Sequence, residues 1–547
     1  MQKRNQALCL TVTLTFILML KGLVFFHTYG GISQDSAWFY STSHNLALHG
    51  KYASSLVPID SNYTPQKQDC INDIFATCAL IDEHGFNWFD LHATVGPVHT
   101  LAAAITVFIF GSNRFSAALI PFMVMTLLFM LVLGLTAKHF GKLACFCVFL
   151  CFYTLPQIYM EYIYQNYAES TGLLFFLLAL LFYKKNQLNL SSLFLSFAVL
   201  CKVIYFIPAS GFLVAVFLKK PLKASFKYLT FFLISPVSWL LIKIIIIINI
   251  FSFQAVKTYF SASLLKFSYG GSGTSTFNHF DLEKIFKQIQ TNITVSYDLG
   301  VYSILVFWLA IAFVLYKKQD TLKKIFCLNT LYLSHFFYIA WFIILNKTGW
   351  FRHLWGPMFF AWCLFGIFLS LLIHALFDPS KKPLSARLIA LAALVLIGFN
   401  LDYPTYSHTF NISQKKFELW HVKRHSARPK GGIGLPVNHI LNWKPQSEVA
   451  DFIKQELPEK SIFYFYSYYY GLEALTFIDF MPHSFYFFQK TDTSIDLKQN
   501  AYLIFPPYNN NYTLFSSVDF IAEDHNEPYS LCKTMIYSRP SYSICKL

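Results

Sequence analysis

The sequence predicts a polytopic α-helical membrane protein with about eleven transmembrane helices and a small extracytoplasmic α/β domain at its C-terminal end. First, the 547 residues are 55% hydrophobic and only 13% charged, which is about half the charged fraction of an average soluble chain. Second, apolar runs of bilayer-spanning length recur from Leu8 to about Asn400. Third, the pattern changes after about Ser447 to short alternating strands.

The first apolar run, Leu8 to Phe26, follows Lys3 and Arg4. A cleaved signal peptide would have a similar pattern, but no Ala-x-Ala cleavage site precedes Asp35. We therefore expect this run to be a retained first span with a cytoplasmic N-terminus.

The loop after this span, residues 27–93, carries an acid close to the membrane, Asp35. Apolar and aromatic residues follow the acid at helical spacing, and Gly50 ends the pattern: Trp38, Tyr40, Leu46 and Leu48. The spacing predicts an amphipathic helix on the membrane surface with the acid at its head. An acid at this depth is costly unless it has a task or a partner, although a helix N-cap is the structural alternative.

Further apolar segments follow this loop at 95–110, 115–137, 143–158, 170–183, 190–202, 204–218, 226–250, 299–316, 325–345, 354–374 and 386–400. Basic clusters separate many of them: Lys138 and Lys142, Lys184 and Lys185, Lys219 to Lys227, Lys317 to Lys324, and Lys381 to Arg387. Because basic loops remain in the cytoplasm, all five clusters should face that side. The net charge of +15 therefore indicates orientation and contact with anionic lipid, not nucleic-acid binding.

The preference of basic loops for the cytoplasm also predicts whether the segment 95–110 crosses the membrane. If it crossed, every later basic cluster would lie outside. Gly96 and Pro97 at its start and its length of 16 residues suit a re-entrant or membrane-surface helix. We therefore predict eleven spans in a bacterial inner membrane, with the N-terminus inside and the C-terminal domain outside.

This arrangement divides the chain into a transmembrane domain (1–400), a linker (401–446) and an extracytoplasmic α/β domain (447–547). In the last domain we expect a helix at 449–457 and strands at 461–466, 501–505, 518–522 and 536–544. Four cysteines outside the apolar runs form two local pairs, Cys70 with Cys78 and Cys532 with Cys545. An oxidising compartment would let both pairs close.

Four pieces of sequence, taken in order, resemble the GT-C superfamily of membrane glycosyltransferases. They are Asp35 with a helix ending in His49-Gly50-Lys51-Tyr52, Gly96-Pro97 with the turn Phe110-Gly111-Ser112-Asn113-Arg114, Glu169 before a span closed by Lys184-Lys185, and Arg352-His353 before Pro357. The closest resemblance is to the bacterial branch related to protein O-mannosyltransferases and the lipid A aminoarabinose transferase. The resemblance covers residues 1–400. It implies transfer of a sugar from a polyprenyl-phosphate donor to a glycan, lipid or protein acceptor on the outer face.

Inverting transfer from a lipid phosphate needs a base for the acceptor, cations for the leaving phosphate and an apolar groove for the lipid. Asp35 suits the base, because desolvation near the membrane would raise the pKa of its carboxyl group. Glu161 and Glu169 are eight residues apart and would share one face of a helix. They could position acceptor hydroxyls or bind a divalent metal ion beside Asp35; a solvated turn is the alternative.

The candidates for binding the donor phosphate are Arg352, His353, Lys347 and Lys202. Arginine suits bidentate phosphate contact, although an arginine that snorkels to lipid headgroups would look the same. Lys202 lies inside an apolar run and is costly there unless it lines a cavity. Three residues near Gly96 are weaker candidates for a metal site, with interfacial packing as the alternative: Asp90, His92 and His99.

Two other classes of function remain open on the sequence alone. A transporter would carry charges at the mid-depth of several spans and repeated halves, and the sequence shows no internal repeat. A non-catalytic lipid-binding protein, or a ligase-like membrane enzyme of the envelope, would share the topology but would not need Asp35. Neither the sugar nor the acceptor follows from the sequence.

Overall fold

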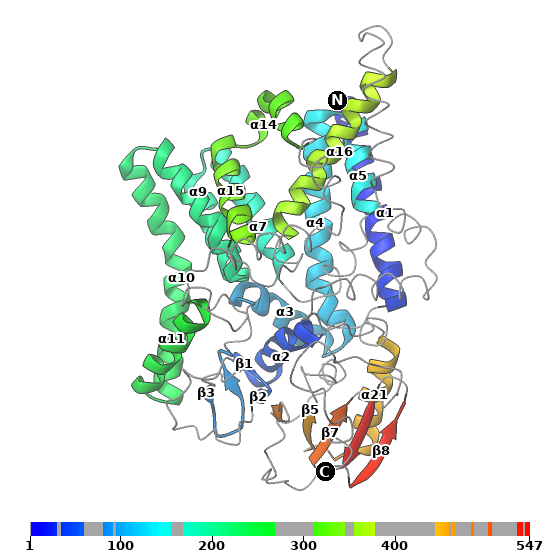
Figure 1. Ribbon diagram of the computed structural model, residues 1–547, viewed down its shortest axis with the longest axis vertical. Coiled ribbons are helices and arrows are strands. Elements are labelled where there is room, and N and C mark those ends of the chain that lie inside the picture. The colour runs from blue at the N-terminus through cyan, green and yellow to red at the C-terminus, as the bar shows by residue number, and fades with distance from the viewer. Residues whose placement is uncertain are drawn as a thin grey trace.

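The structure, a computed structural model, describes residues 2–29, 34–58, 80–90, 95–154, 168–268, 311–344, 355–377, 443–458, 461–465, 483–485, 501–505, 533–539 and 542–546. Figure 1 shows a bundle of long helices, a layer of short helices and strands beneath it, and a small α/β domain at the lower end. The N-terminus lies at the end of the bundle opposite this domain.

The bundle consists of α1 (Gln2–Tyr29), α4 (Arg114–Phe140), α5 (Lys142–Thr154), α7 (Glu169–Lys184), α8 (Leu188–Cys201), α9 (Phe206–Lys219), α10 (Leu222–Ile250), α15 (Leu328–Ile344) and α16 (Trp355–Phe377). In the part of the chain that the structure describes, four helices are long and apolar enough to cross a membrane, and a bent pair could add a fifth. That pair is α14 (Gln319–Ile325) and α15, which meet at 96°. The chain is therefore a polytopic membrane protein, as predicted. The number of eleven spans stays a prediction. The last predicted span, 386–400, lies outside the described residues.

The segment that we predicted not to cross forms α3 (Pro97–Phe110) and lies beside α2 (Gln34–His49) below the bundle (Figure 1). Its 14 residues span about 21 Å, less than the hydrocarbon core of about 30 Å. The start of α3 is held against α8, because a Cβ at Gly96 would lie 2.0 Å from the carbonyl oxygen of Leu200. That this helix lies at the membrane surface stays a prediction.

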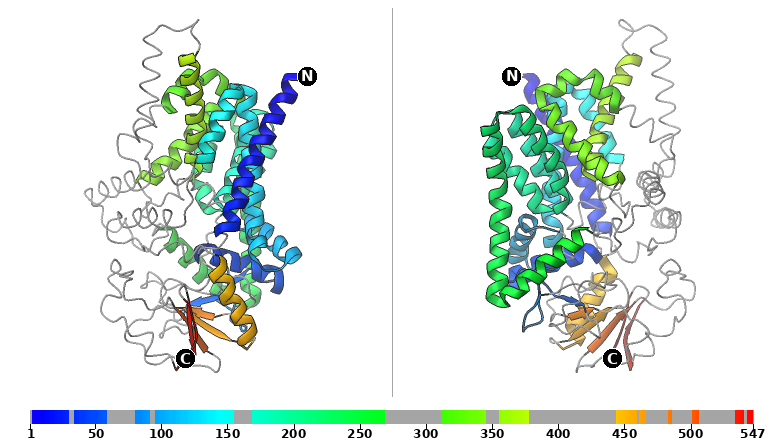
Figure 2. Two further views of the ribbon diagram at one scale, coloured as in Figure 1. Left: turned by 90° about the vertical axis from the view of Figure 1, so that its right-hand side faces the viewer. Right: turned by 60° about the vertical axis from the view of Figure 1, so that its left-hand side comes forward.

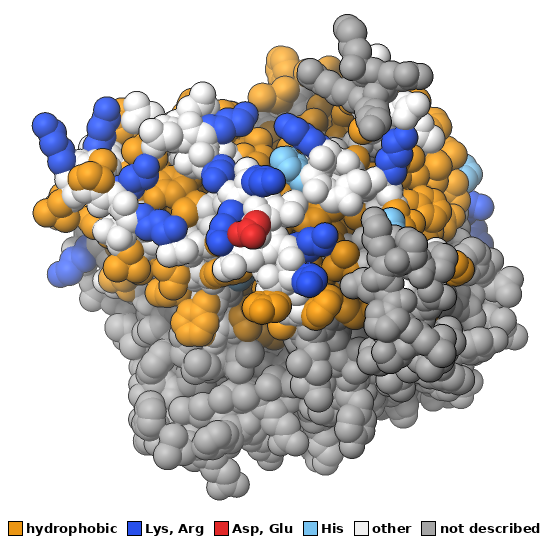
Figure 3. Space-filling view, turned by 90° about the horizontal axis from the view of Figure 1, so that it is seen from above, with side chains coloured by type: hydrophobic (Ala, Val, Ile, Leu, Met, Phe, Trp, Pro, Cys, Tyr) orange, Lys and Arg blue, Asp and Glu red, His pale blue; other side chains and the backbone are white. Residues whose placement is uncertain are grey.

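Lysine side chains gather at the end of the bundle that carries the N-terminus (Figure 3). The exposed ones come from four of the predicted basic clusters: Lys138, Lys142, Lys184, Lys185, Lys219, Lys223, Lys227, Lys317, Lys323 and Lys324. Side-chain contacts join these turns to one another and to the N-terminal helix. Lys220 Nζ donates to Asn186 Oδ1 at 2.8 Å, and Lys142 Nζ donates to Gln6 Oε1 at 2.7 Å. Four clusters thus share one face, as the basic-loop bias requires.

We predict that this basic face is cytoplasmic and that the C-terminal domain is outside. Single cysteines placed at Lys184 and at Glu456, both exposed, test the orientation with a membrane-impermeant thiol reagent applied to intact cells. The cysteine at 456 should be labelled, and the one at 184 should react only after the membrane is opened. Labelling at 184 in intact cells would invert the topology.

The C-terminal domain packs α21 (Trp443–Glu456) against a sheet of β5 (Ile462–Phe465), β7 (Ala501–Phe505), β9 (Ser543–Lys546) and β8 (Thr534–Ser538), in the order β5-β7-β9-β8. β5 and β7 are parallel, and the other neighbours are antiparallel. The helix starts earlier than predicted, so the boundary expected at residue 447 falls inside it. The single strand expected at 536–544 is the hairpin of β8 and β9.

The predicted cysteine pairs lie mostly outside the described part of the chain. Cys545 is disulfide-bonded, as expected for an oxidising compartment, whereas Cys532, Cys70 and Cys78 are not among the described residues. The strand predicted at 518–522 and the linker before α21 also lie outside them.

The C-terminal domain is joined in two ways to the loop that follows the first apolar run. Strand β2 (Leu56–Pro58) pairs in parallel with β6 (His483–Phe485). One buried apolar cluster also contains Trp38 and Tyr40 of α2 together with residues of α21 and the sheet, and Figure 2 shows α21 directly below the bundle. Residues 36–45 of α2 are consequently all buried. The expectation of an amphipathic helix with one exposed face was therefore wrong, since the C-terminal domain covers the second face.

Three other described strands of this loop form a sheet, in which β4 (Asn87–Trp88) lies between β1 (Ala53–Ser54) and β3 (Leu80–Ile81). Asp82 organises its turn, accepting from Lys51 Nζ at 2.7 Å and from Trp88 Nε1 at 3.0 Å. Burial raises the pKa of Asp82, but these hydrogen bonds outweigh it and hold the pKa below its usual value.

Candidate functional site

Helix α2 carries Asp35 as its second residue, while the side chain of this residue lies outside the described part of the structure. Two hydrogen bonds fix α2 to the beginning of α4. Tyr40 OH and Ser116 Oγ are 2.7 Å apart, and His44 Nδ1 and Ser112 Oγ are 2.8 Å apart. The turn at 110–114 is one of the four resembling pieces. It therefore supports α2, the helix that carries Asp35.

A buried ion pair lies at the same end of the bundle. Glu169 begins α7, and Lys202 lies at the break between α8 and α9. Lys202 Nζ and Glu169 Oε1 are 2.5 Å apart, and the two side chains are 7% and 1% exposed. Ala168, directly before Glu169, adopts a left-handed φ of 64°, which costs free energy for a residue with a side chain. The backbone is thus held in an unfavourable conformation directly before Glu169.

Two tyrosines lie near Glu169: Tyr205 from the short 3-10 helix before α9, and Tyr338 from α15. Tyr205, in the short 3-10 helix Val203–Tyr205, donates its hydroxyl to the backbone oxygen of Glu169 at 2.6 Å. Its ring packs so closely on α7 that a Cβ at Gly172 would lie 2.2 Å from it. Within the described residues, Glu169 Oε2 and the hydroxyl of Tyr338 are buried without a hydrogen-bond partner. Buried polar atoms without a partner are unusual in folded proteins. Glu169 Oε2 and the Tyr338 hydroxyl therefore mark a place where a ligand could bind.

Helix α2 touches this ion pair through Phe39. Lys202 Nζ lies 5.5 Å from the centroid of the Phe39 ring, and Phe39 packs with Val95 and Ala168. Asp35 precedes Phe39 by four residues, so the two lie on the same face of α2 and about 6 Å apart along its axis. The backbone of Asp35 is therefore about one helical turn from Phe39, which contacts the Glu169–Lys202 pair.

Two of the three candidates for a metal site, Asp90 and His99, bind different partners in the described residues. Asp90 Oδ2 accepts a hydrogen bond from Trp38 Nε1 at 2.7 Å, and His99 Nδ1 is 2.8 Å from Thr171 Oγ1. His92 lies outside the described part. No group of three or more His, Cys, Asp or Glu side chains able to hold a metal ion is found among the residues that the structure describes.

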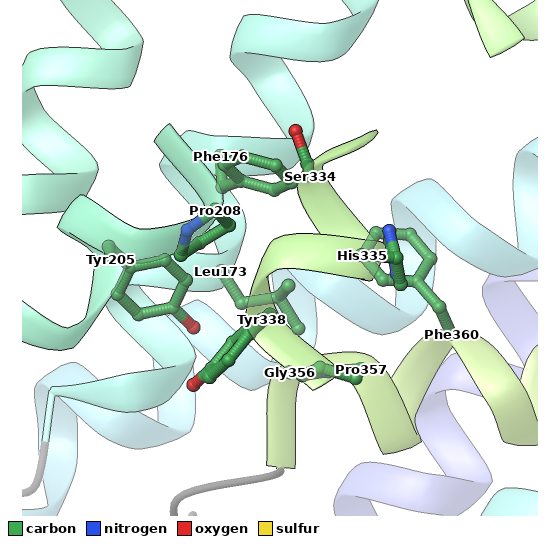
Figure 4. A pocket seen from close by; sticks show the side chains of 10 residues that line it. All are labelled: Leu173, Phe176, Tyr205, Pro208, Ser334, His335, Tyr338, Gly356, Pro357 and Phe360. Carbon is green, nitrogen blue, oxygen red and sulfur yellow. The ribbon is translucent and has the colours of Figure 1, made fainter. Parts of the chain in front are cut away.

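A small pocket opens between α7, α9, α15 and α16, and its walls are largely apolar (Figure 4). It is lined by Leu173, Phe176, Tyr205, Pro208, Ser334, His335, Tyr338, Gly356, Pro357 and Phe360. In Figure 4 the hydroxyls of Tyr205 and Tyr338 point toward the same side of the pocket. Because Tyr205 also bonds to Glu169, this pocket adjoins the buried ion pair.

Four of the predicted catalytic and phosphate-binding residues lie outside the described ranges: Glu161, Lys347, Arg352 and His353. Helix α16 begins at Trp355, three residues after Arg352, and it lines the pocket with Gly356 and Pro357. The sequence interpretation of Pro357 as the entry to a late span is thereby confirmed.

Sequence reasoning missed Lys243 on α10. Its ammonium lies 5.4 to 5.6 Å from the ring centroids of Phe89, Trp239 and Tyr259. A signal was available, because Lys243 is a single lysine inside an apolar run, as Lys202 is, and such a lysine is costly in a membrane without partners.

No protein-family model matches the chain, and no curated protein matches it. Among solved structures it is similar to two crystal structures of ArnT from Cupriavidus metallidurans, one bound to undecaprenyl phosphate and one in the apo state. The first shows 13% sequence identity and a TM-score of 0.46, and it covers 98% of this chain and 97% of that chain. The second shows 12% identity and a TM-score of 0.48 with the same coverage.

Proposed function

We propose that this chain is a membrane glycosyltransferase of the GT-C superfamily that transfers a sugar from a polyprenyl-phosphate donor to an acceptor on the outer membrane face. The observation that carries the proposal is the contact of Phe39 with Lys202, because it brings the Asp35 helix to the buried Glu169–Lys202 pair. Three of the four resembling pieces thus meet at one end of the bundle, and Asp35 and Glu169 are more than a hundred residues apart in the sequence.

Asp35 is the general base of the proposed reaction. It takes the proton of the acceptor hydroxyl or amine while that atom attacks the anomeric carbon of the sugar. The bond between the sugar and the phosphate oxygen breaks on the opposite side, and polyprenyl phosphate leaves with the electron pair. One base and one leaving group on opposite faces invert the configuration of the anomeric carbon.

The leaving phosphate needs positive charge close by, and Arg352 supplies it in this proposal. Guanidinium groups bind phosphate through two parallel hydrogen bonds and keep their charge in poorly hydrated surroundings. His353 and Lys347 are its neighbours in sequence. Lys202 already forms an ion pair with Glu169. It could bind the phosphate only if its ammonium contacted the carboxylate and the phosphate at the same time.

Glu169 has a different role in this proposal, as a second acid that orients the acceptor. Its Oε1 is held by Lys202 and its Oε2 is the buried oxygen without a partner, so one acceptor hydroxyl could donate to it. Glu161 is the other candidate for this role. A divalent metal ion bound beside Asp35 remains the alternative arrangement.

The pocket between α7, α9, α15 and α16 is the proposed entry of the polyprenyl chain. Its apolar and aromatic lining suits an isoprenoid, and the sequence places Arg352 directly before α16, which forms one wall. The protein would work in a bacterial inner membrane, with its catalytic end and C-terminal domain in the periplasm.

Binding of the donor tests this proposal. Purified protein in detergent should bind a polyprenyl phosphate, and Arg352→Ala should weaken the binding by about 10- to 100-fold, because it removes a charge-assisted contact of about 1.5–3 kcal/mol. Lys185→Ala removes an exposed positive charge at the basic end of the bundle. This variant should bind the polyprenyl phosphate with the affinity of the unchanged protein. Equal affinity of Arg352→Ala and the unchanged protein would remove Arg352 from the phosphate site.

Absence of any binding to a polyprenyl phosphate would refute the enzyme proposal itself. Binding without transfer to any acceptor fraction would favour the lipid-binding class, in which Asp35 has no catalytic task.

A further inference from the structure

A strained turn lies immediately before Asp90. Phe89 is not glycine, yet its φ is 50°, in the left-handed region that residues with a side chain rarely adopt. The backbone on both sides of Phe89 is tied down: its N–H donates to the oxygen of Tyr52 at 3.1 Å, and its oxygen accepts from Tyr259 OH at 3.1 Å. Strain of this kind persists only where the surroundings over-determine it, and it is common at functional sites.

Two helices from outside the first loop support this turn. Tyr259 belongs to α11 (Phe253–Ser268), and its hydroxyl accepts a hydrogen bond from Lys243 of α10 at 3.3 Å. Burial raises the pKa of Tyr259, and the nearby Tyr52 and Asp90 raise it further, so the hydroxyl stays protonated and can donate to Phe89. The rings of Phe89 and Tyr259 also share the ammonium of Lys243.

The carboxylate that follows the turn is attached to α2. Asp90 Oδ2 accepts from Trp38 Nε1 at 2.7 Å, and the two residues are 6% and 4% exposed. A hydrogen bond between a carboxylate and an N–H group is stronger than a neutral one, and burial protects it from competing water. Trp38 lies three residues after Asp35 on the same helix, so this bond fixes α2 less than one helical turn from Asp35.

We infer that the Phe89–Asp90 turn positions α2, the proposed catalytic helix. Asp90 binds Trp38 and thereby fixes the position of Asp35 relative to the Glu169–Lys202 pair. Asp90 is then a positioning residue and not a metal ligand. The inference rests on the proposed role of Asp35 as the base. It explains why a costly φ is maintained at Phe89: the turn directs Asp90 to the indole.

Kinetics of four variants test this role. Trp38→Phe keeps the aromatic packing and removes the N–H, and Asp90→Ala removes the acceptor. Each should lower kcat about tenfold, the value of one such hydrogen bond, with an unchanged KM for the lipid donor. Combining the two substitutions should cost little more than either alone, because both break the same bond. Asp90→Asn keeps an acceptor oxygen for the indole and should recover most of the rate.

Trp88→Phe is the matched control. It removes a similar indole hydrogen bond in the same loop, to Asp82 and not to Asp90, and it should leave kcat within about twofold. If Asp90→Asn is as impaired as Asp90→Ala, or if the double variant loses the product of the two single effects, Asp90 acts directly on the reaction or on a metal and the inference is wrong.

Hydrogen exchange gives a readout that does not depend on activity. Amides of residues 34–49 should exchange faster in Trp38→Phe and Asp90→Ala than in the unchanged protein, and at the original rate in Asp90→Asn and Trp88→Phe. Unaltered exchange of α2 in both damaging variants would overturn the inference. If no lipid-linked sugar supports transfer by the unchanged protein, the proposed function fails, and the exchange pattern still decides whether Asp90 holds α2.

Discussion

Asp35→Asn is expected to lower the rate of sugar transfer by roughly 10²- to 10⁴-fold, which is the usual contribution of a general base. Asparagine has nearly the same shape and can still form hydrogen bonds, but it cannot take a proton from the acceptor. Because Asp35 lies in the first turn of a helix that is held by Tyr40, His44 and Trp38, the amount of folded protein should remain close to normal. The measurement is transfer of label from a purified polyprenyl-phosphate sugar in liposomes.

Asp320→Asn is the control for this change, because Asp320 is exposed at the basic end of the bundle. It makes the same chemical substitution far from the proposed site and should transfer at the normal rate. If Asp35→Asn also transfers at the normal rate, Asp35 is a structural residue of α2. The base would then have to be Glu169 or Glu161.

Lys202→Met is expected to destabilise the protein by about 3–5 kcal/mol, because it leaves the carboxylate of Glu169 buried without its partner. The carboxylate is 1% exposed, so water cannot replace the ammonium. Methionine keeps most of the aliphatic side chain, which limits the loss of packing. Thermal unfolding of the purified protein in detergent, followed by a fluorescent thiol or dye assay, measures the change.

Combining Lys202→Met with Glu169→Gln should recover much of this stability, since neither charge then remains unpaired. Lys51→Met is a matched comparison in which the partner is Asp82 and the lysine side chain is 19% exposed; its loss should be smaller. A Lys202→Met protein as stable as the unchanged one would mean that the ion pair does not contribute to the fold.

Local patterns in the sequence predicted much of the architecture. Apolar runs located the bundle helices to within a few residues, and Gly50 ended α2 where expected. These features depend on composition and periodicity over one helix, and burial in lipid or water decides them locally.

The candidate site was predictable only in part, because it depends on contacts between distant segments. Nothing in the spacing of Glu169 and Lys202, or of Trp38 and Asp90, reveals that these pairs meet. The burial of both faces of α2 follows from a domain more than 400 residues later in the chain. The resemblance indicated which acid and which cations to consider, but long-range packing determines which of them are adjacent.

Transfer of label is the most direct measurement of the central claim. Purified protein in liposomes would receive a polyprenyl-phosphate sugar labelled in the sugar, together with a membrane fraction from cells that lack the protein as the source of acceptor. The account predicts that label leaves the polyprenyl carrier and appears in the acceptor fraction with the unchanged protein and not with Asp35→Asn. Label that stays on the carrier with every such donor, to the same extent as in liposomes without protein, would contradict it.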